Sequence, residues 1–370
     1  MTSDSTLALV ESPAQLLNVI ELAHRAASPG GAATVGTDAG GSDRIDDLGD
    51  LRVAVLAPSQ GRSREQLRAM VALARGQGLS VSWHEPRSGG ASVARTIRGL
   101  LAELGRTRRL VVGDPFSGVL QVLIGLVRPN EVVIVDDGTA TLEFVRQWAA
   151  GEALHRWHQP FVELRPGMTG AARQQVAANL RRRLAPEAGT RLRLFTCMPL
   201  TDAGLESAGV GVSANTYAWL QGHFGQPDVL DGVDLIGTSL VESGVVDGDA
   251  YLAGVGRLVE QQGVTRYLAH RRESDTKLDR VRALGVEVAL PSLPLEVEAR
   301  RGPVSATLIS FPSTVVHTLP VVLADTRVVT QVCAVPDDWF LPGVDPAAEA
   351  FLRRVTTSAL SSHRLGAVAC

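Results

Sequence analysis

A run of four β-branched residues, Val132–Val135, is followed directly by two carboxylates and a glycine, Asp136-Asp137-Gly138. Such a run predicts a buried strand, and parallel α/β folds bind ligands at the carboxyl ends of their strands. Two adjacent carboxylates also tend to separate their pKa values, which suits one of them to act as a base. By itself the tripeptide favours a simpler interpretation, a turn before a helix that follows Thr139. Its meaning therefore depends on the rest of the chain.

Short apolar runs alternate with segments of helical periodicity along most of the sequence. This alternation predicts parallel sheets that are covered by helices on both faces. The expected strands are 7–10, 53–56, 81–83, 110–112, 132–135 and 192–195 in a first series, and 234–236, 266–269, 286–289 and 307–309 in a second. The expected helices are 15–25, 64–77, 91–104, 117–126, 171–184, 249–262, 277–284 and 346–360.

The two series predict two domains, which a length of 370 residues accommodates. We place the first domain at residues 1–200 and the second at 201–370, with a loop-rich junction near 199–231 and a closing C-terminal helix. Residues 26–50, rich in Gly, Ala, Ser and Asp, are expected to form a flexible loop. The predicted fold class is α/β, with two doubly wound, Rossmann-like domains facing a cleft, as in GT-B glycosyltransferases.

Composition narrows the classes of function. A net charge of −3 favours neither nucleic acid nor an anionic membrane surface as a partner. The start of the chain has no basic segment typical of a secretory signal, and no apolar run is long enough to span a bilayer, so any membrane association would be peripheral. Three scattered cysteines predict neither a zinc site nor a disulfide framework. We therefore expect a cytoplasmic protein, with the inner face of the membrane as an alternative location.

Small and polar groups follow several strands of the second series. Because carboxyl ends of parallel strands meet at one edge of a sheet, these residues could line a single pocket. Hydroxyls and amides before a helix suit a phosphate, a histidine could bind or protonate it, and a carboxylate could accept ribose hydroxyls. Structural roles remain open for each, as a core histidine, a helix cap or a solvated acid. The residues are Gly237, Thr238, His270, Glu296, Ser313 and Thr314.

Several short segments occur in an order that resembles the bacterial GT-B sialyltransferases of the lipooligosaccharide sialyltransferase and polysialyltransferase-like group. Two departures are Arg271, where that family usually has proline, and the insertion at 26–49. The similar segments are Val10-Glu11-Ser12-Pro13-Ala14-Gln15-Leu16-Leu17-Asn18, Asp136-Asp137-Gly138, Ile236-Gly237-Thr238-Ser239-Leu240-Val241-Glu242, Tyr267-Leu268-Ala269-His270-Arg271-Arg272-Glu273, Leu293-Pro294-Leu295-Glu296 and Ser310-Phe311-Pro312-Ser313-Thr314.

The resemblance implies an inverting transfer of sialic acid, or a related ulosonic acid, from a CMP donor to a glycan hydroxyl. Asp137 would be the general base and His270 would stabilise or protonate the leaving phosphate. No cofactor and no metal ion are implied. The remaining donor-binding residues would be Gly237, Thr238, Arg271, Glu296, Ser313 and Thr314, and the acceptor side would include Gln15, Asp114, Asp136 and Gly138.

Other functions remain open on the same fold. One is a GT-B transferase that uses CMP-Kdo or another nucleotide sugar, and another is a non-catalytic sugar- or nucleotide-binding protein. The expected partners are a nucleotide-sugar donor and a glycan acceptor. The identity of the acceptor, the linkage and the oligomeric state do not follow from the sequence.

Overall fold

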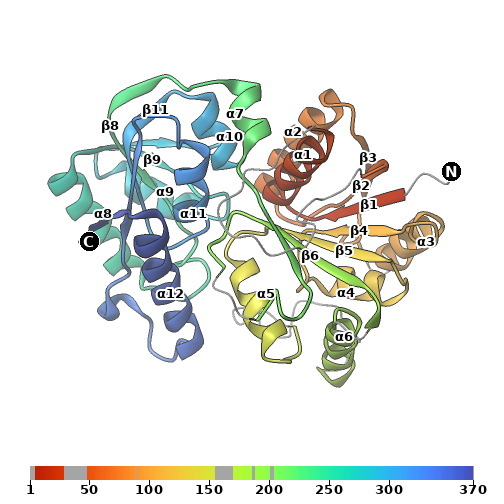
Figure 1. Ribbon diagram of the computed structural model, residues 1–370. Helices are drawn as coiled ribbons and strands as arrows, with labels where there is room; N and C mark the ends of the chain where they lie inside the picture. Colours follow the sequence, from red (N-terminus) through yellow and green to blue (C-terminus); the bar gives the residue numbers. More distant parts are fainter. Residues whose placement is uncertain are drawn as a thin grey trace. The chain divides into compact units, whose positions relative to one another are not determined.

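The computed structural model describes residues 5–28, 48–89, 91–154, 170–185, 188–200 and 204–369. The chain divides into two compact units, Met1–Trp219 and Leu220–Cys370 (Figure 1). This division lies 19 residues beyond the expected boundary at 200/201 but within the expected junction 199–231. The difference arises because β7 (Gly211–Ala214) pairs in parallel with β6 (Arg191–Thr196) and so extends the first sheet.

The first unit is built on a sheet of seven parallel strands in the order β3-β2-β1-β4-β5-β6-β7. The chain winds outward in one direction from β1 to β3 and in the other from β4 to β7, so the switch point lies between β1 and β4. Its other strands are β1 (Ser5–Val10), β2 (Asp50–Leu56), β3 (Ser80–His84), β4 (Arg109–Val112) and β5 (Glu131–Val135).

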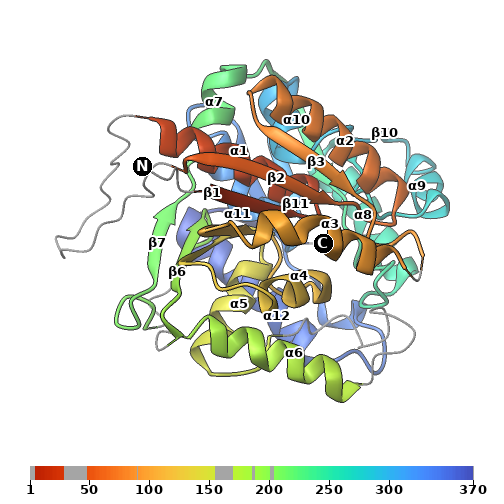
Figure 2. The ribbon, with the colours of Figure 1, turned by 90° about the vertical axis from the view of Figure 1, so that its right-hand side faces the viewer.

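Helices cover both faces of this sheet: α1 and α2 lie on one face, and α4 and α6 run side by side on the other (Figures 1 and 2). Leucines and valines of α3, α4, α5 and α6 form one core with alternate residues of the strands. The helices are α1 (Pro13–Ala27), α2 (Gly61–Gly76), α3 (Ser92–Leu104), α4 (Gly118–Gly125), α5 (Ala140–Ala149) and α6 (Gly170–Arg183).

The second unit repeats this connectivity in a six-stranded parallel sheet of order β10-β9-β8-β11-β12-β13, with its switch point between β8 and β11. The strands are β8 (Val229–Ile236), β9 (Val264–Leu268), β10 (Glu287–Ala289), β11 (Val304–Ser310), β12 (Val329–Cys333) and β13 (Gly366–Val368). The helices are α8 (Gly248–Gln262), α9 (Asp275–Arg282), α10 (Leu295–Arg301), α11 (Val315–Val322), the 3-10 turn η2 (Asp337–Trp339) and α12 (Pro346–His363). The short helix α7 (Ala218–Phe224) spans the division between the units.

Several details differ from the sequence expectations. β6 is not the last strand of the first series, and α12 is followed by β13, which pairs with β12. Cys333 is disulfide-bonded, contrary to the expectation for the cysteines. Of the expected loop 26–50, α1 occupies residues up to Ala27 and β2 begins at Asp50, while 29–47 lie outside the described residues. No helix in the described part of the chain is both long and apolar enough to cross a membrane.

Candidate functional site

The switch point of the first unit holds the side chain of Gln15. Ser12 caps α1 by accepting a hydrogen bond from the Gln15 amide at 3.2 Å, and the buried Gln15 side chain turns back to accept one from the Glu11 amide at 2.6 Å. A Cβ at Gly113, directly after β4, would lie 2.3 Å from Gln15 Oε1. Glycine is therefore required there, because the backbone after β4 passes directly against Gln15.

Asp114 follows in the same turn and is buried. Its Oδ1 accepts a hydrogen bond from the Phe116 amide at 2.9 Å, the geometry of an Asx turn. The structure thus places Gln15 and Asp114 near one another at the switch-point edge of the sheet. Their contact with a sugar stays a prediction.

The two carboxylates after β5 have different environments. Asp136 is buried and accepts hydrogen bonds from Thr141 Oγ1 at 2.7 Å and from the Cys197 amide at 2.8 Å. Burial raises the pKa of Asp136 to about 6, although these hydrogen bonds act in the opposite direction. Its backbone carbonyl also accepts a hydrogen bond from the Asn18 side chain at 2.9 Å. Asp136 therefore joins the ends of β5 and β6 to α1 and α5.

Asp137 is the more exposed of the pair, and Ser12 Oγ donates a hydrogen bond to its Oδ1 at 3.3 Å. Gly138 has φ 70°, a left-handed conformation that glycine adopts without strain, and this turns the chain into α5. Thr139 occupies the N-cap of α5 without a side-chain capping bond. Asp136-Asp137-Gly138 therefore forms a turn before a helix, which is the simpler interpretation of the tripeptide. The same turn also leaves Asp137 partly exposed at the carboxyl edge of the sheet.

The switch point of the second unit brings together three segments that carry predicted donor-binding residues. Ile236, at the end of β8, is in register with Ser310 of β11 on one side and Leu268 of β9 on the other. Since neighbouring strands are about 4.8 Å apart, the segments that follow these three residues lie next to one another. Those segments carry Gly237 and Thr238, Ser313 and Thr314, and His270.

Hydroxyl groups precede α11 at this edge. Ser313 Oγ lies 3.3 Å from Ser310 Oγ, and both Ser313 and Thr314 are partly exposed. Thr314 occupies the N-cap of α11, but its hydroxyl makes no capping bond to the helix amides. The first amides of α11 and two hydroxyls are therefore present where an anion could bind.

His270 follows β9 and is only partly exposed. Its Nδ1 accepts a hydrogen bond from the Arg272 amide at 3.2 Å, which requires Nδ1 to be unprotonated and places the ring proton on Nε2. Burial, together with the cationic neighbours Arg271, Arg272 and Lys277, lowers the pKa of His270 to about 3. At neutral pH the ring is thus a hydrogen-bond donor through Nε2 rather than a proton donor.

A buried charged cluster, which we call the Lys277 cluster, lies beneath this loop and was missed in the sequence analysis. It consists of Lys277, Glu273, Glu242, Tyr251 and Tyr267. Lys277 Nζ lies 2.8 Å from Glu273 Oε1 and 3.3 Å from Glu242 Oε2, and it is 4.3 Å from the centre of the Tyr251 ring. The Tyr251 and Tyr267 hydroxyls are 2.7 Å apart.

The Lys277 cluster holds both neighbouring strand ends. Lys277 Nζ donates to the Thr238 carbonyl at 2.7 Å, and Glu273 Oε2 accepts from the His270 amide at 2.6 Å. A Cβ at Gly237 would lie 2.3 Å from that same Glu273 oxygen, so the close approach requires glycine. The available sequence signal was that Lys277 is the only lysine of the chain and follows Glu273 by four residues.

Glu296 lies on α10 and is buried, not solvated. Its Oε1 accepts a hydrogen bond from Thr318 Oγ1 of α11 at 2.8 Å, so the carboxylate joins α10 to α11. This structural contact accounts for one oxygen of the group, and the expected contact with ribose stays a prediction. The described residues contain no group of three or more His, Cys, Asp and Glu side chains placed to hold a metal ion.

Comparisons with known proteins support the fold. No family model and no curated protein matches the sequence. A putative UDP-N-acetylglucosamine 2-epimerase from Listeria monocytogenes has a similar structure, with a TM-score of 0.53 and 11% identity over 99% of this chain and 92% of that chain. Weaker similarity is found to the S. aureus MnaA–UDP structure (TM-score 0.49, 8% identity, 98% and 89% covered) and to Acinetobacter baumannii MurG (0.41, 10%, 99% and 86%). With its two doubly wound parallel sheets, the protein therefore has the GT-B-like α/β fold that the sequence predicted.

Proposed function

We propose that this protein is an inverting glycosyltransferase that moves sialic acid, or a related ulosonic acid, from a CMP donor to a glycan hydroxyl. The observation that carries the proposal is the switch point of the second unit. There the hydroxyls of Ser313 and Thr314, the first amides of α11 and a neutral His270 meet at one sheet edge. This is a set of hydrogen-bond donors, as a nucleotide phosphate requires.

Several donors would act on the phosphate together. The N-terminus of α11 contributes about half a positive charge through its free amides. Ser313, Thr314 and His270 Nε2 would each donate a hydrogen bond to the phosphate oxygens, and Arg271 would contact the phosphate or the sugar carboxylate. Glu296 would bind the ribose or cytosine side. With a pKa of about 3, His270 is suited to stabilise the departing phosphate by hydrogen bonding rather than to protonate it.

The first unit would supply the base. Asp137 removes the proton from the acceptor hydroxyl, whose oxygen forms a bond to the anomeric carbon while the bond from that carbon to the CMP phosphate oxygen breaks with inversion. Asp136 would keep this turn in place from its buried position, and Gln15, Asp114 and Gly138 would line the acceptor side. The transferred sugar of such a donor carries its own carboxylate, and the leaving group, CMP, is a phosphate monoester. We therefore propose that the reaction needs neither a cofactor nor a metal ion.

A second donor class is favoured by one comparison. The Listeria protein of similar fold is described as an enzyme of UDP-N-acetylglucosamine, so a UDP-sugar is the first alternative to a CMP donor. CMP-Kdo and a non-catalytic nucleotide-binding role are the others. The proposed location is cytoplasmic, with peripheral association at the inner membrane face as an alternative, and the proposed partners are the donor and a glycan acceptor.

Calorimetric titration with CMP, CDP, UMP and UDP, without added metal, tests the donor. We expect selective binding of CMP that is weakened at least tenfold in His270→Ala, because one charge-assisted hydrogen bond contributes about 1.5–3 kcal/mol. The matched control is His24→Ala, which removes a histidine from the first unit. Preference for UDP would move the donor to another sugar nucleotide, and binding of none of the four would refute a nucleotide site.

Transfer assays with CMP-ulosonic acids test the base. Asp137→Asn should lower kcat by about 10²–10⁴-fold while CMP affinity stays unchanged, since the base acts on the acceptor proton and not on the donor. Glu103→Gln, a loss of one acid elsewhere in the first unit, is the control. A wild-type rate in Asp137→Asn would show that Asp137 is not the general base. Activity that is lost after EDTA treatment and restored only by a metal ion would overturn the metal-free mechanism.

A further inference from the structure

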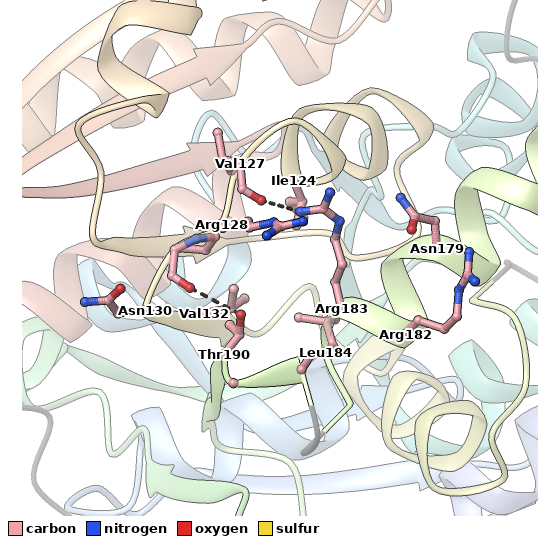
Figure 3. Close-up of a pocket in the computed structure, with 13 residues that line it drawn as sticks. Ile124, Val127, Arg128, Asn130, Val132, Asn179, Arg182, Arg183, Leu184 and Thr190 are labelled. Atoms are coloured by element: carbon pink, nitrogen blue, oxygen red, sulfur yellow. Dashed lines mark hydrogen bonds between the residues drawn. The ribbon is translucent and has the colours of Figure 1, made fainter.

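The first unit contains a cavity of about 580 Å³ at the amino-terminal edge of its sheet (Figure 3). Such a volume is within the range of small-molecule sites. Apolar side chains from α4, β5 and the end of α6 line part of it, namely Ile124, Val132 and Leu184. The polar part of its lining is formed by Arg128, Asn130, Asn179, Arg182, Arg183 and Thr190.

This cavity is separate from the carboxylates of the proposed active site. Asn130 and Val132 lie at the beginning of β5, whereas Asp136 and Asp137 follow its end. At about 3.3 Å per residue, the two ends of this strand are roughly 15 Å apart. The cavity therefore has no part in the chemistry that we assign to Asp137.

The charge of the cavity is strongly positive. Three arginines line it, and within the described residues none of them is paired with a carboxylate. The C-terminal ends of α4 and α6 lie there too, and each contributes about half a negative charge, so the lining formed by the described residues keeps about two positive charges. Arg182 and Arg183 of α6 line this recess together with Arg128 from the segment between α4 and β5.

One of these arginines is held in position. Arg183 Nη1 reaches from α6 to donate a hydrogen bond to the Val127 carbonyl at 2.5 Å (Figure 3). This bond satisfies a carbonyl just beyond the end of α4. Arg128 follows Val127 directly, so the anchored segment places the second guanidinium beside the cavity, and Arg182 and Asn179 add donors from α6.

We propose that this cavity binds a ligand through its phosphate group. Guanidinium groups present paired N–H donors that match two phosphate oxygens, and the side-chain amides can donate to a third. The phosphate could belong to a small soluble molecule or to the headgroup of a lipid. Leu126, which is 53% exposed and lies two residues before Arg128, would in the second case contact the apolar part of the lipid.

The test compares Arg128→Ala/Arg182→Ala with Arg95→Ala/Arg98→Ala, a double variant that loses the same charge from exposed positions of α3. Arg183 is kept because it also stabilises the α4 end. Titration with inorganic pyrophosphate measures the soluble ligand, and sedimentation with phosphatidylglycerol against phosphatidylcholine vesicles measures the lipid. Since pyrophosphate could also enter the second unit, His270→Ala/Ser313→Ala is a further control.

We expect the cavity variant to lose at least tenfold in affinity for pyrophosphate or for anionic vesicles, while the α3 variant binds as the wild type does. In His270→Ala/Ser313→Ala, the part of the binding that depends on the cavity arginines should remain. Pyrophosphate binding that depends on the cavity arginines would identify a soluble phosphate, and vesicle binding alone would identify a lipid headgroup. If neither probe binds, or if the cavity and α3 variants lose affinity equally, the proposal is wrong. None of these outcomes depends on transferase activity.

Discussion

Replacing Lys277 by methionine removes the only cation of a buried cluster beneath the proposed phosphate site. The side chain is 5% exposed, and its ammonium group contacts Glu273, whose side chain is fully buried, and the Thr238 carbonyl. Methionine keeps most of the volume but leaves the Glu273 carboxylate without its cation. Removing one partner of a buried ion pair typically costs about 3–5 kcal/mol, because the other charge remains desolvated.

The expected loss depends on pH in a defined direction. Burial raises the pKa of Glu273, and Lys277 is the main group that opposes this effect. Without the lysine the carboxylate should therefore take up a proton more readily in the folded protein. A group with a raised folded-state pKa contributes stability at low pH that is lost as pH rises, so the variant should be least stable relative to wild type above neutral pH.

Urea unfolding at pH 8 and pH 5, with hydrogen exchange followed in peptides of β8 and β9, measures this effect within the second unit. At pH 8 we expect a loss of about 3–5 kcal/mol, or roughly 6–20 °C in Tm for a unit of this size. Arg280→Met on the same helix is the control, because Arg280 and Asp249 are 53% and 83% exposed. Such an exposed pair contributes at most about 1 kcal/mol.

The double variant Lys277→Met/Glu273→Gln should recover at least half of the loss, because it removes the uncompensated charge. CMP affinity should fall in Lys277→Met as well, since the Thr238 and His270 backbones lose a shared anchor. A single variant within 1 kcal/mol of wild type at pH 8, or a double variant no more stable than the single one, would refute the reasoning.

Three further predictions concern stability. Through Asp136, whose folded-state pKa of about 6 lies above its ordinary 3.8, the free energy of unfolding should fall by about 2 kcal/mol from pH 4 to pH 7. Denaturation of Asp136→Asn should lack this part of the pH dependence. His317 is fully buried, both of its ring nitrogens lack a hydrogen-bond partner in the described structure, and its pKa is lowered to about 4. His317→Leu should therefore gain about 1–3 kcal/mol of stability at pH 7, and more at pH 4.5, where the wild type is destabilised. A thermal stability below that of the wild type at both pH values would contradict this. Gly113→Ala should lose about 1–3 kcal/mol of stability, because the added Cβ displaces Gln15. Gly99→Ala on α3 meets open space and should gain up to about 1 kcal/mol of stability. Equal shifts in Tm for the two variants would exclude the steric explanation.

The candidate site could be predicted in part because the strand ends are visible in the sequence. Short apolar runs that stop at Gly, Asp, Ser or His locate the carboxyl ends of strands, and the structure places Asp137 and Thr238 at such ends. The different environments of Asp136 and Asp137 were not visible. They arise from tertiary packing, which buries Asp136 and brings to it the amide of Cys197, 61 positions further along the chain.

Local sequence pattern thus determined the parallel α/β class and the positions of most helices and strands, since periodicity and caps act within a few residues. It could not reveal β7 and β13, which are four and three residues long and acquire their partners only when the sheets form. Tertiary structure alone decided the strand order, and with it the two switch points at which residues distant in sequence meet. It also decided that Lys277 and Glu273 are buried beneath one of them, because burial depends on packing from every direction and not on the neighbours along the chain.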